Sequence, residues 1–122
     1  MLFRSDPDAA DVFLRLAELN TAKRDWLAVV INAERHLAVN PLFAEPHHYL
    51  ARAKEELHET PAAITAYRTV LQIEPPDPAD VHFRLAKLLR DSDAVEAKRH
   101  VLQALEEAPR FREAHQIGRA HV

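Results

Sequence analysis

Histidine and carboxylate side chains are the groups in this sequence that could bind a metal ion or transfer protons. The chain has eight histidines and 19 acidic residues, and both types of side chain ligate Zn²⁺ and act as general acids or bases. His47 and His48 are neighbours, so their side chains point to different sides of a helix and are poorly placed to ligate one ion together. The helix motif H-E-x-x-H is absent, and no partner recurs at a ligand spacing beside His36, His58 and His100. We therefore predict no metal site.

Motifs for catalysis and cofactor binding are also missing. Gly118 is the single glycine, so the chain has neither a phosphate-binding glycine loop nor a G-x-S-x-G turn. Paired carboxylates such as Glu55 and Glu56, or Glu106 and Glu107, are typical of the solvated surface of a helix. The lack of cysteine excludes disulfides, thiol catalysis and cysteine metal ligands. We predict no catalytic residue, no cofactor and no enzymatic reaction for this segment.

The elements that position these side chains follow a repeat. Three prolines, Pro41, Pro75 and Pro109, recur at an interval of 34 residues, and each closes a stretch of two amphipathic segments. A period of this length indicates an array of identical helical units rather than one closed core around an active site. Apolar residues recur at helical spacing, and no segment alternates as a strand would. Helices are expected at 8–20, 25–39, 43–57, 61–73, 78–90 and 94–107.

Each repeat has a Leu-Ala step near its start, three residues after a large ring. The rings are Phe13, His47 and His82, and the steps are Leu16-Ala17, Leu50-Ala51 and Leu85-Ala86. This pattern resembles the tetratricopeptide repeat (TPR) family, whose period is 34 residues. Alanine stands where that family usually has glycine, and histidine twice replaces its aromatic residue, where we expect it to fill the seam between helices. The resemblance implies an all-α fold, a right-handed alpha-alpha superhelix (solenoid) of three TPR helix-turn-helix hairpins.

Helix caps and turns agree with this arrangement. We expect N-caps at Asp25, at Asp77 before Pro78, at Asp93 with Glu96 as a capping box, and at Thr60 before Pro61. In the third repeat, the hairpin turn after Arg90 is expected to be one residue shorter and the loop before Pro78 one residue longer.

The two ends of the chain depart from the repeat. Residues 2–5 (Leu-Phe-Arg-Ser) and 116–122 (Gln-Ile-Gly-Arg-Ala-His-Val) both match translations of common short-read sequencing adapters. We interpret 1–5 as a non-native leader and 116–122 as a non-native tail, which makes the native part a fragment of a longer protein. The repeats then cover 6–43, 44–77 and 78–111, and 112–115 begins a truncated next helix. Ordinary terminal sequence is the alternative, and genomic DNA encoding both ends would establish it.

Charge and hydropathy restrict the classes of partner. The formal net charge is −3 and the sequence has no basic run, which disfavours nucleic acid, whose binding needs a basic surface. No apolar stretch approaches the length of a membrane span, so we expect no direct membrane insertion. The composition favours neither the cytoplasm nor the periplasm, and it indicates no particular oligomeric state.

The TPR resemblance implies a groove lined by the first helix of each hairpin. The implied groove positions in the first repeat include Leu14 and Glu18, where family members that clamp a C-terminal carboxylate have lysine and asparagine. An acidic residue there would repel such a ligand. The groove is expected to be acidic in its N-terminal part and basic, with one exposed aromatic residue, in its C-terminal part. The residues expected to contact a partner are His48, Arg52, Phe83, Lys87 and Arg90.

The resemblance therefore implies a protein–protein interaction module that binds an extended peptide or a partner helix in its concave groove. Basic residues on the fifth helix, Arg84, Lys87 and Arg90, suit an acidic peptide, but three bases on one helix are also typical of plain solubilising charge. Two alternatives stay open. The repeats are the noncatalytic tail of a larger bacterial enzyme such as a peptidase, or they are a scaffold that spaces neighbouring domains.

Overall fold

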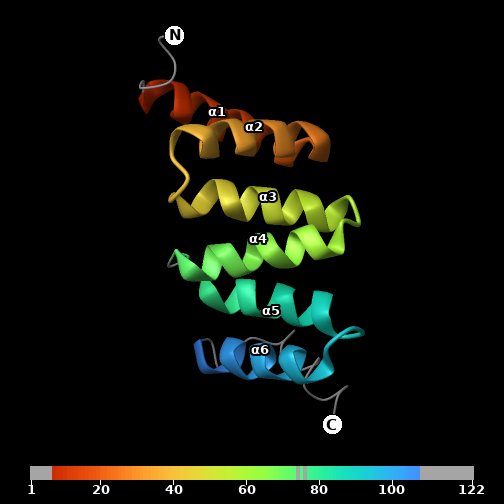
Figure 1. Ribbon diagram of the computed structural model, residues 1–122. Helices are drawn as coiled ribbons and strands as arrows, with labels where there is room; N and C mark the ends of the chain where they lie inside the picture. Colours follow the sequence, from red (N-terminus) through yellow and green to blue (C-terminus); the bar gives the residue numbers. More distant parts are fainter. Residues whose placement is uncertain (1–6, 74, 76, 108–122) are drawn as a thin grey trace. The chain divides into compact units, whose positions relative to one another are not determined.

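The computed structural model describes residues 7–73, 75 and 77–107 of the chain. These residues form six α-helices and no strand, which confirms the expected all-α architecture (Figure 1). The helices are α1 (Pro7–Ala22), α2 (Trp26–Val39), α3 (Ala44–Glu56), α4 (Thr60–Gln72), α5 (Pro78–Leu89) and α6 (Ala94–Glu107). The chain divides into two compact units, an N-terminal unit (Met1–Ile73) and a C-terminal unit (Glu74–Val122).

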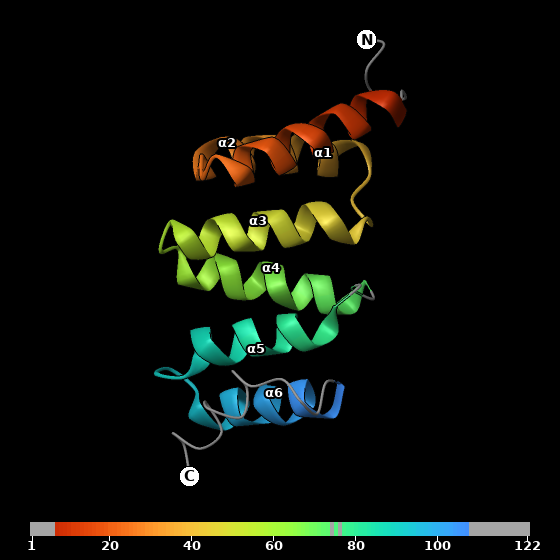
Figure 2. The same ribbon diagram turned by 180° about the vertical axis from the view of Figure 1, so that it is seen from behind.

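The N-terminal unit consists of two helical hairpins. Helix α1 packs on α2 and α3 packs on α4, while α2, with a smaller contribution from α1, packs on α3. In both views α1 and α2 lie together on one side of α3, and α4 lies on its other side (Figure 1 and Figure 2). Helix α3 is therefore the central element of this unit.

The C-terminal unit contains one described hairpin, in which α5 packs on α6. Its core is formed by Ala86, Val101 and Ala104, and the partly buried side chains of Phe83 and Leu105 pack around these residues. Small residues dominate this core, so the two helix backbones can approach each other closely.

Small residues occupy the same repeat positions in all three hairpins. The alanines of the Leu-Ala steps are fully buried in each repeat: Ala17, Ala51 and Ala86. The equivalent residues of the second helices are fully buried as well: Val29, Ala63 and Ala97. These positions confirm the predicted repeat register. The leucines before the alanines differ, because Leu85 is fully buried, Leu50 is half-buried and Leu16 is exposed.

Three of the four expected N-caps are confirmed. The carboxylate of Asp25 accepts a hydrogen bond from the amide of Ala28, and those of Asp77 and Asp93 accept from the amides three residues on. The expectation for Thr60 is wrong. Helix α4 already begins at Thr60, its N-cap is Glu59 without a side-chain capping bond, and Pro61 lies within the first turn.

The hairpin turns differ between the repeats. The first two contain one residue each with a left-handed backbone, Arg24 with φ 58° and His58 with φ 61°. The third hairpin turn was expected to be one residue shorter. The hairpin is one residue shorter between equivalent buried positions, because Ala86 and Ala97 are 11 residues apart where Ala51 and Ala63 are 12 apart, but the turn itself is not shorter. Helix α5 ends at Leu89 instead, and the turn before α6 has four residues where the other two have three. The loop before α5 is one residue longer than the loop before α3, as predicted. The interpretations of residues 1–5, 112–115 and 116–122 lie outside the described residues.

Candidate functional site

Two of the expected contact residues, His48 and Arg52, lie one turn apart on α3. The ring of His48 meets the ring of Tyr67 edge to face, with 6.0 Å between their centroids. The guanidinium carbon of Arg52 lies 5.6 Å from the centroid of the Trp26 ring, at the start of α2. The Arg52 Nε is buried and has no hydrogen-bond partner among the described residues. Packing inside the N-terminal unit therefore holds both side chains in place, and Arg52 keeps a cation–π contact with α2.

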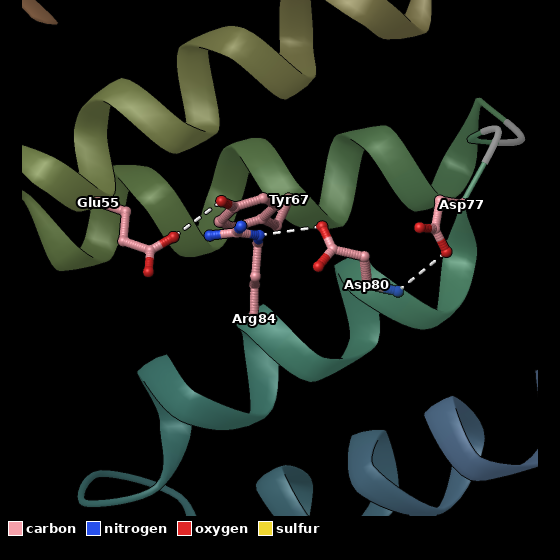
Figure 3. Close-up of polar contacts among 5 residues, drawn as sticks. All are labelled: Glu55, Tyr67, Asp77, Asp80 and Arg84. Atoms are coloured by element: carbon pink, nitrogen blue, oxygen red, sulfur yellow. Dashed lines mark hydrogen bonds and ion pairs between the residues drawn. The ribbon is translucent and has the colours of Figure 1, made fainter. Parts of the chain in front are cut away.

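The next turn of α3 carries a polar contact with α4. The hydroxyl of Tyr67 donates a hydrogen bond of 2.8 Å to Oε1 of Glu55 (Figure 3). Tyr67 is fully buried, so its hydroxyl needs a partner, and a carboxylate is a strong acceptor. Glu55, expected on a solvated surface, is half-buried and directs one carboxylate oxygen toward α4.

Helices α1 and α3 present acidic groups around a tyrosine. Burial raises the pKa of the Tyr49 hydroxyl above its usual value, and the negative charges of Glu18 and Glu45 raise it further. Both glutamates are exposed, whereas Leu14 is half-buried. Two acidic residues from different helices thus act on one side chain, and this part of the N-terminal unit is an acidic surface.

In the C-terminal unit, Phe83 and Lys87 lie one turn apart on α5. The Phe83 ring is half-buried and packs against the core of Ala86, Val101 and Ala104, so the expectation that it is exposed is wrong. The Nζ of Lys87 lies 5.1 Å from the centroid of that ring. Arg90 is exposed and lies one residue beyond α5, as its C-cap. Phe83 therefore supports the ammonium group of Lys87 and offers only part of its ring to a ligand.

Arg84, another basic residue of α5, forms an ion pair within the same helix. The Nε of Arg84 lies 3.0 Å from Oδ2 of Asp80, one turn earlier (Figure 3). The amide of Asp80 donates to Asp77, the N-cap residue. Because both side chains of the ion pair are largely buried, Arg84 contributes little positive charge to the surface. Lys87 and Arg90 are the exposed bases of this segment.

A histidine pair joins α5 to α6, and the sequence analysis missed it. Nδ1 of His82 lies 2.9 Å from Nδ1 of His100, with the rings stacked 5.1 Å apart, and His100 Nε2 lies 3.6 Å from Oε1 of Glu96. Burial lowers the pKa of His82, and the charge of His100 lowers it further. A hydrogen bond forms between the two Nδ1 nitrogens when one of them carries a proton and the other does not, so protonation of both would break the contact. The four-residue spacing of Glu96 and His100, which places both on one face of a helix, was the sequence signal that could have pointed to this cluster.

His36 was also left without an assigned role, and it is a packing residue of α2. Its ring is buried and stacks on Phe43, with 5.5 Å between the centroids. Burial lowers its pKa, although the charges of Asp11 and Glu45 act in the opposite direction. His36 stands at the repeat position where the second hairpin has the fully buried Val70, so an imidazole here takes the place of an apolar side chain.

The described part of the chain lacks two other kinds of feature. No group of three or more histidine or acidic residues there is placed to hold a metal ion. No helix described by the structure combines the length and apolar character that crossing a membrane requires.

Comparison with known proteins gives matches among solved structures. No family model matches the sequence, and no curated protein matches it. The first TPR of Spaghetti (RPAP3), bound to an HSP90 peptide, matches at a TM-score of 0.84 and 15% identity, over 97% of this chain and 94% of that one. The Yersinia enterocolitica chaperone SycD, in complex with a peptide of the translocator YopD, matches at a TM-score of 0.84 and 15% identity. This match covers 95% of this chain and 94% of that one. MamA matches at a TM-score of 0.87 and 18% identity, over 95% of this chain and 68% of that one. These matches extend over nearly the whole chain and therefore include the six helices that the structure describes.

Proposed function

The chain has the tetratricopeptide repeat fold, and from that premise we propose that it is a protein-binding module. Its ligand is an extended peptide or a helix of a partner protein, held against the first helices of the hairpins. The proposed contact residues are His48, Arg52, Phe83, Lys87 and Arg90.

One observation carries this proposal. The solved structures of the Spaghetti TPR and of SycD hold peptides, and each shares its fold with more than nine-tenths of this chain. Helical repeats present extended surfaces without an interior pocket, which suits the binding of a chain segment better than that of a small molecule.

The side chains of α3 support the proposal through their preorganisation. Arg52 is held over Trp26 and His48 against Tyr67, so a ligand that contacts them would restrict few additional rotamers. Fixing a long side chain on binding costs on the order of 1 kcal/mol of conformational free energy. Contacts within the N-terminal unit already restrict these side chains, so a ligand would add little to that cost.

The charges indicate which peptides fit. Lys87 and Arg90 are exposed and suit acidic groups of a ligand, whereas Glu18 and Glu45 suit basic ones. We do not propose the HSP90 peptide as a ligand of this chain. Where the carboxylate-clamping members of the family have lysine and asparagine, this chain has Leu14 and Glu18, and Glu18 would repel a terminal carboxylate.

The experiment begins with selection of peptide ligands for the purified chain from a displayed library, followed by titration calorimetry. Reversing both charges, Lys87→Glu with Arg90→Glu, is expected to weaken the selected ligand several-fold and to reduce the salt dependence of its affinity. Unchanged affinity would remove these two residues from the site. If no ligand of micromolar affinity is selected, the proposed function itself fails.

A control with the same change in net charge is available on α6. Lys98 and Arg99 are adjacent and exposed, and they belong to the second helix of the hairpin. Lys98→Glu with Arg99→Glu is expected to leave the affinity within a factor of about two, because surface charges outside a contact are screened. An equal loss in both double variants would indicate a general charge effect and not a local contact.

The proposal assigns no reaction to this segment. Its ligand class is protein or peptide and not nucleic acid, because the net charge of −3 disfavours the binding of phosphates. Arg52 offers a separate test within the N-terminal unit, because Arg52→Lys keeps the positive charge but removes the guanidinium group that lies over Trp26.

A further inference from the structure

Helix α1 exposes an apolar stripe. Val12, Leu16 and Leu19 are 53%, 38% and 57% exposed, and their spacing of four and three residues places them on one face of the helix. Exposed single leucines are common, but three large apolar side chains in a row along one helix mark an interaction surface.

The same repeat positions are covered in the second hairpin. The equivalents of the stripe on α3 are Pro46, Leu50 and Ala53, of which Pro46 and Ala53 are fully buried and Leu50 is half-buried. Helix α2 packs on α3 within the N-terminal unit. The equivalents on α5 are Val81, Leu85 and Leu88, and none of them is exposed. On α3 this face is covered within the N-terminal unit, whereas on α1 it is exposed.

We propose that the stripe of Val12, Leu16 and Leu19 is a homodimer interface, in which α1 of one copy packs antiparallel to α1 of a second copy. The spacing of the three residues is that of the a and d positions of a coiled coil, so two such helices can interdigitate. A twofold contact of one surface with itself is the commonest way in which identical chains associate. Leu16 lies near the middle of the stripe and therefore close to the twofold axis.

Charge along α1 selects the antiparallel direction. Asp11 is near the start of the helix with a largely exposed side chain, and the exposed Lys23 and Arg24 follow its end. Antiparallel packing brings Asp11 toward the partner's Lys23, whereas parallel packing would place like charges side by side. Asp11 lies 3.7 Å from Arg15 of its own helix, an exposed pair that is weak enough to rearrange.

A second exposed apolar pair serves as the matched control. Leu27 and Ile31 of α2 are 67% and 50% exposed, so they are as accessible as the stripe. Their equivalents on α4, Pro61 and Thr65, are exposed too. That face is solvent-exposed in both hairpins of the N-terminal unit and is not proposed as an interface.

Sedimentation velocity between roughly 1 µM and 1 mM, where small apolar interfaces associate, tests the proposal. The wild-type chain is expected to become dimeric as its concentration rises, and Leu16→Glu to remain monomeric. Leu27→Glu introduces the same charge and is expected to dimerise like the wild type. A monomeric wild-type chain over the whole range overturns the proposal, and so does equal loss of dimer in both variants.

A cross-linking experiment tests the geometry without a buried charge. The chain has no cysteine, so Leu16→Cys and Leu27→Cys each provide one thiol. Oxidation is expected to link two copies through Leu16→Cys and not through Leu27→Cys, because a disulfide requires close Cα atoms. Failure of Leu16→Cys to cross-link overturns the antiparallel register, as does a faster reaction of Leu27→Cys.

Charge exchange adds a test of direction. Asp11→Lys is expected to weaken the dimer, and Asp11→Lys combined with Lys23→Glu to restore it. A double variant as weak as the single one would overturn the antiparallel arrangement. This proposal is independent of the ligand site: Leu16→Glu is expected to bind selected peptides as the wild type does, so the two proposals can fail separately.

Discussion

The second hairpin (α3 and α4) and the third (α5 and α6) share their small-residue packing. Ala51 and Ala63 are fully buried in the former, and Ala86 and Ala97 at the same repeat positions are fully buried in the latter. The approach of the two helices is thus determined by the repeat register and is independent of the one-residue difference between the hairpins.

Polar contacts at equivalent positions of the two hairpins differ. In the second hairpin, Nε2 of His47 lies 2.8 Å from the carbonyl oxygen of Pro41, before α3. In the third, the histidine at the same repeat position, His82, pairs with His100 on α6. Tyr67 is buried and its hydroxyl donates to Glu55, whereas the third hairpin has the apolar Val101 at the same repeat position. The register therefore specifies which backbone segments meet, while polar side chains bond to whichever group lies within reach.

The largest expected effect tests the shared packing. Ala51→Leu and Ala86→Leu each force a larger side chain into a filled seam and should destabilise the chain by about 1 to 3 kcal/mol, as overpacking does. Urea unfolding followed by circular dichroism measures both variants. Ala38→Leu, at an exposed position of α2, is the control and should be nearly neutral. A neutral result for either buried alanine would mean that the two seams are not equivalent.

An intermediate effect tests the histidine pair, which among the described helices joins α5 to α6 of the third hairpin. The pKa of His82 is lowered by burial and by His100, so below about pH 6.5 the unfolded chain takes up a proton that the folded chain resists. The contribution of His82 to stability is therefore fully present above that pH, and it is lost as the pH decreases through the folded pKa. His82→Phe, which installs the residue type of Phe13, should make the chain less sensitive between pH 7.5 and pH 5.

Thermal unfolding at a series of pH values measures this effect. His36 also has a lowered pKa, so His82→Phe should remove part of the pH dependence and not all of it. Val101→Ala in the same hairpin is the control, because it removes packing without removing a titrating group and should lower stability equally at every pH. A pH profile of His82→Phe that parallels the wild type would show that the pair is not responsible.

The helices were predictable from the sequence because their signals are local. The segment expected at 94–107 is helix α6, and that expected at 25–39 differs from α2 by one residue. Aspartates such as Asp25 and Asp77 mark helix starts through a bond to an amide three residues on. Thr60 failed as a cap because Glu59 took the N-cap position, where no side-chain bond is required if water reaches the amides.

The contacts of the candidate site were less predictable because they depend on distances between helices. The cation–π contact of Arg52 with Trp26 joins residues 26 positions apart, and nothing in the local sequence fixes that approach. Phe83 was assigned to the surface by its repeat position, but the small residues Ala86 and Ala104 leave room for its ring against the core. The His82 and His100 contact likewise depends on how α5 and α6 align after α5 ends early.

The smallest expected effect distinguishes the turns of the two hairpins. His58 has a left-handed backbone with φ 61°, which costs a residue with a side chain about 1 kcal/mol or more relative to glycine. Arg90, after α5, has φ −51° and ψ −43° and bears no such cost. Glycine loses more conformational entropy on folding, about 0.5 to 1 kcal/mol. His58→Gly should therefore raise stability slightly, whereas Arg90→Gly should lower it by about the entropic amount.

Chemical denaturation with several replicates resolves differences of this size, and His58→Ala separates the two causes. Alanine removes the imidazole but keeps the Cβ, so it retains the cost of the left-handed backbone and should not share the gain of His58→Gly. Arg24→Gly, at φ 58° in the first hairpin, should repeat the result of His58→Gly. If Arg90→Gly stabilised the chain as much as His58→Gly, the gain would not come from backbone handedness, and the turns would differ in length alone.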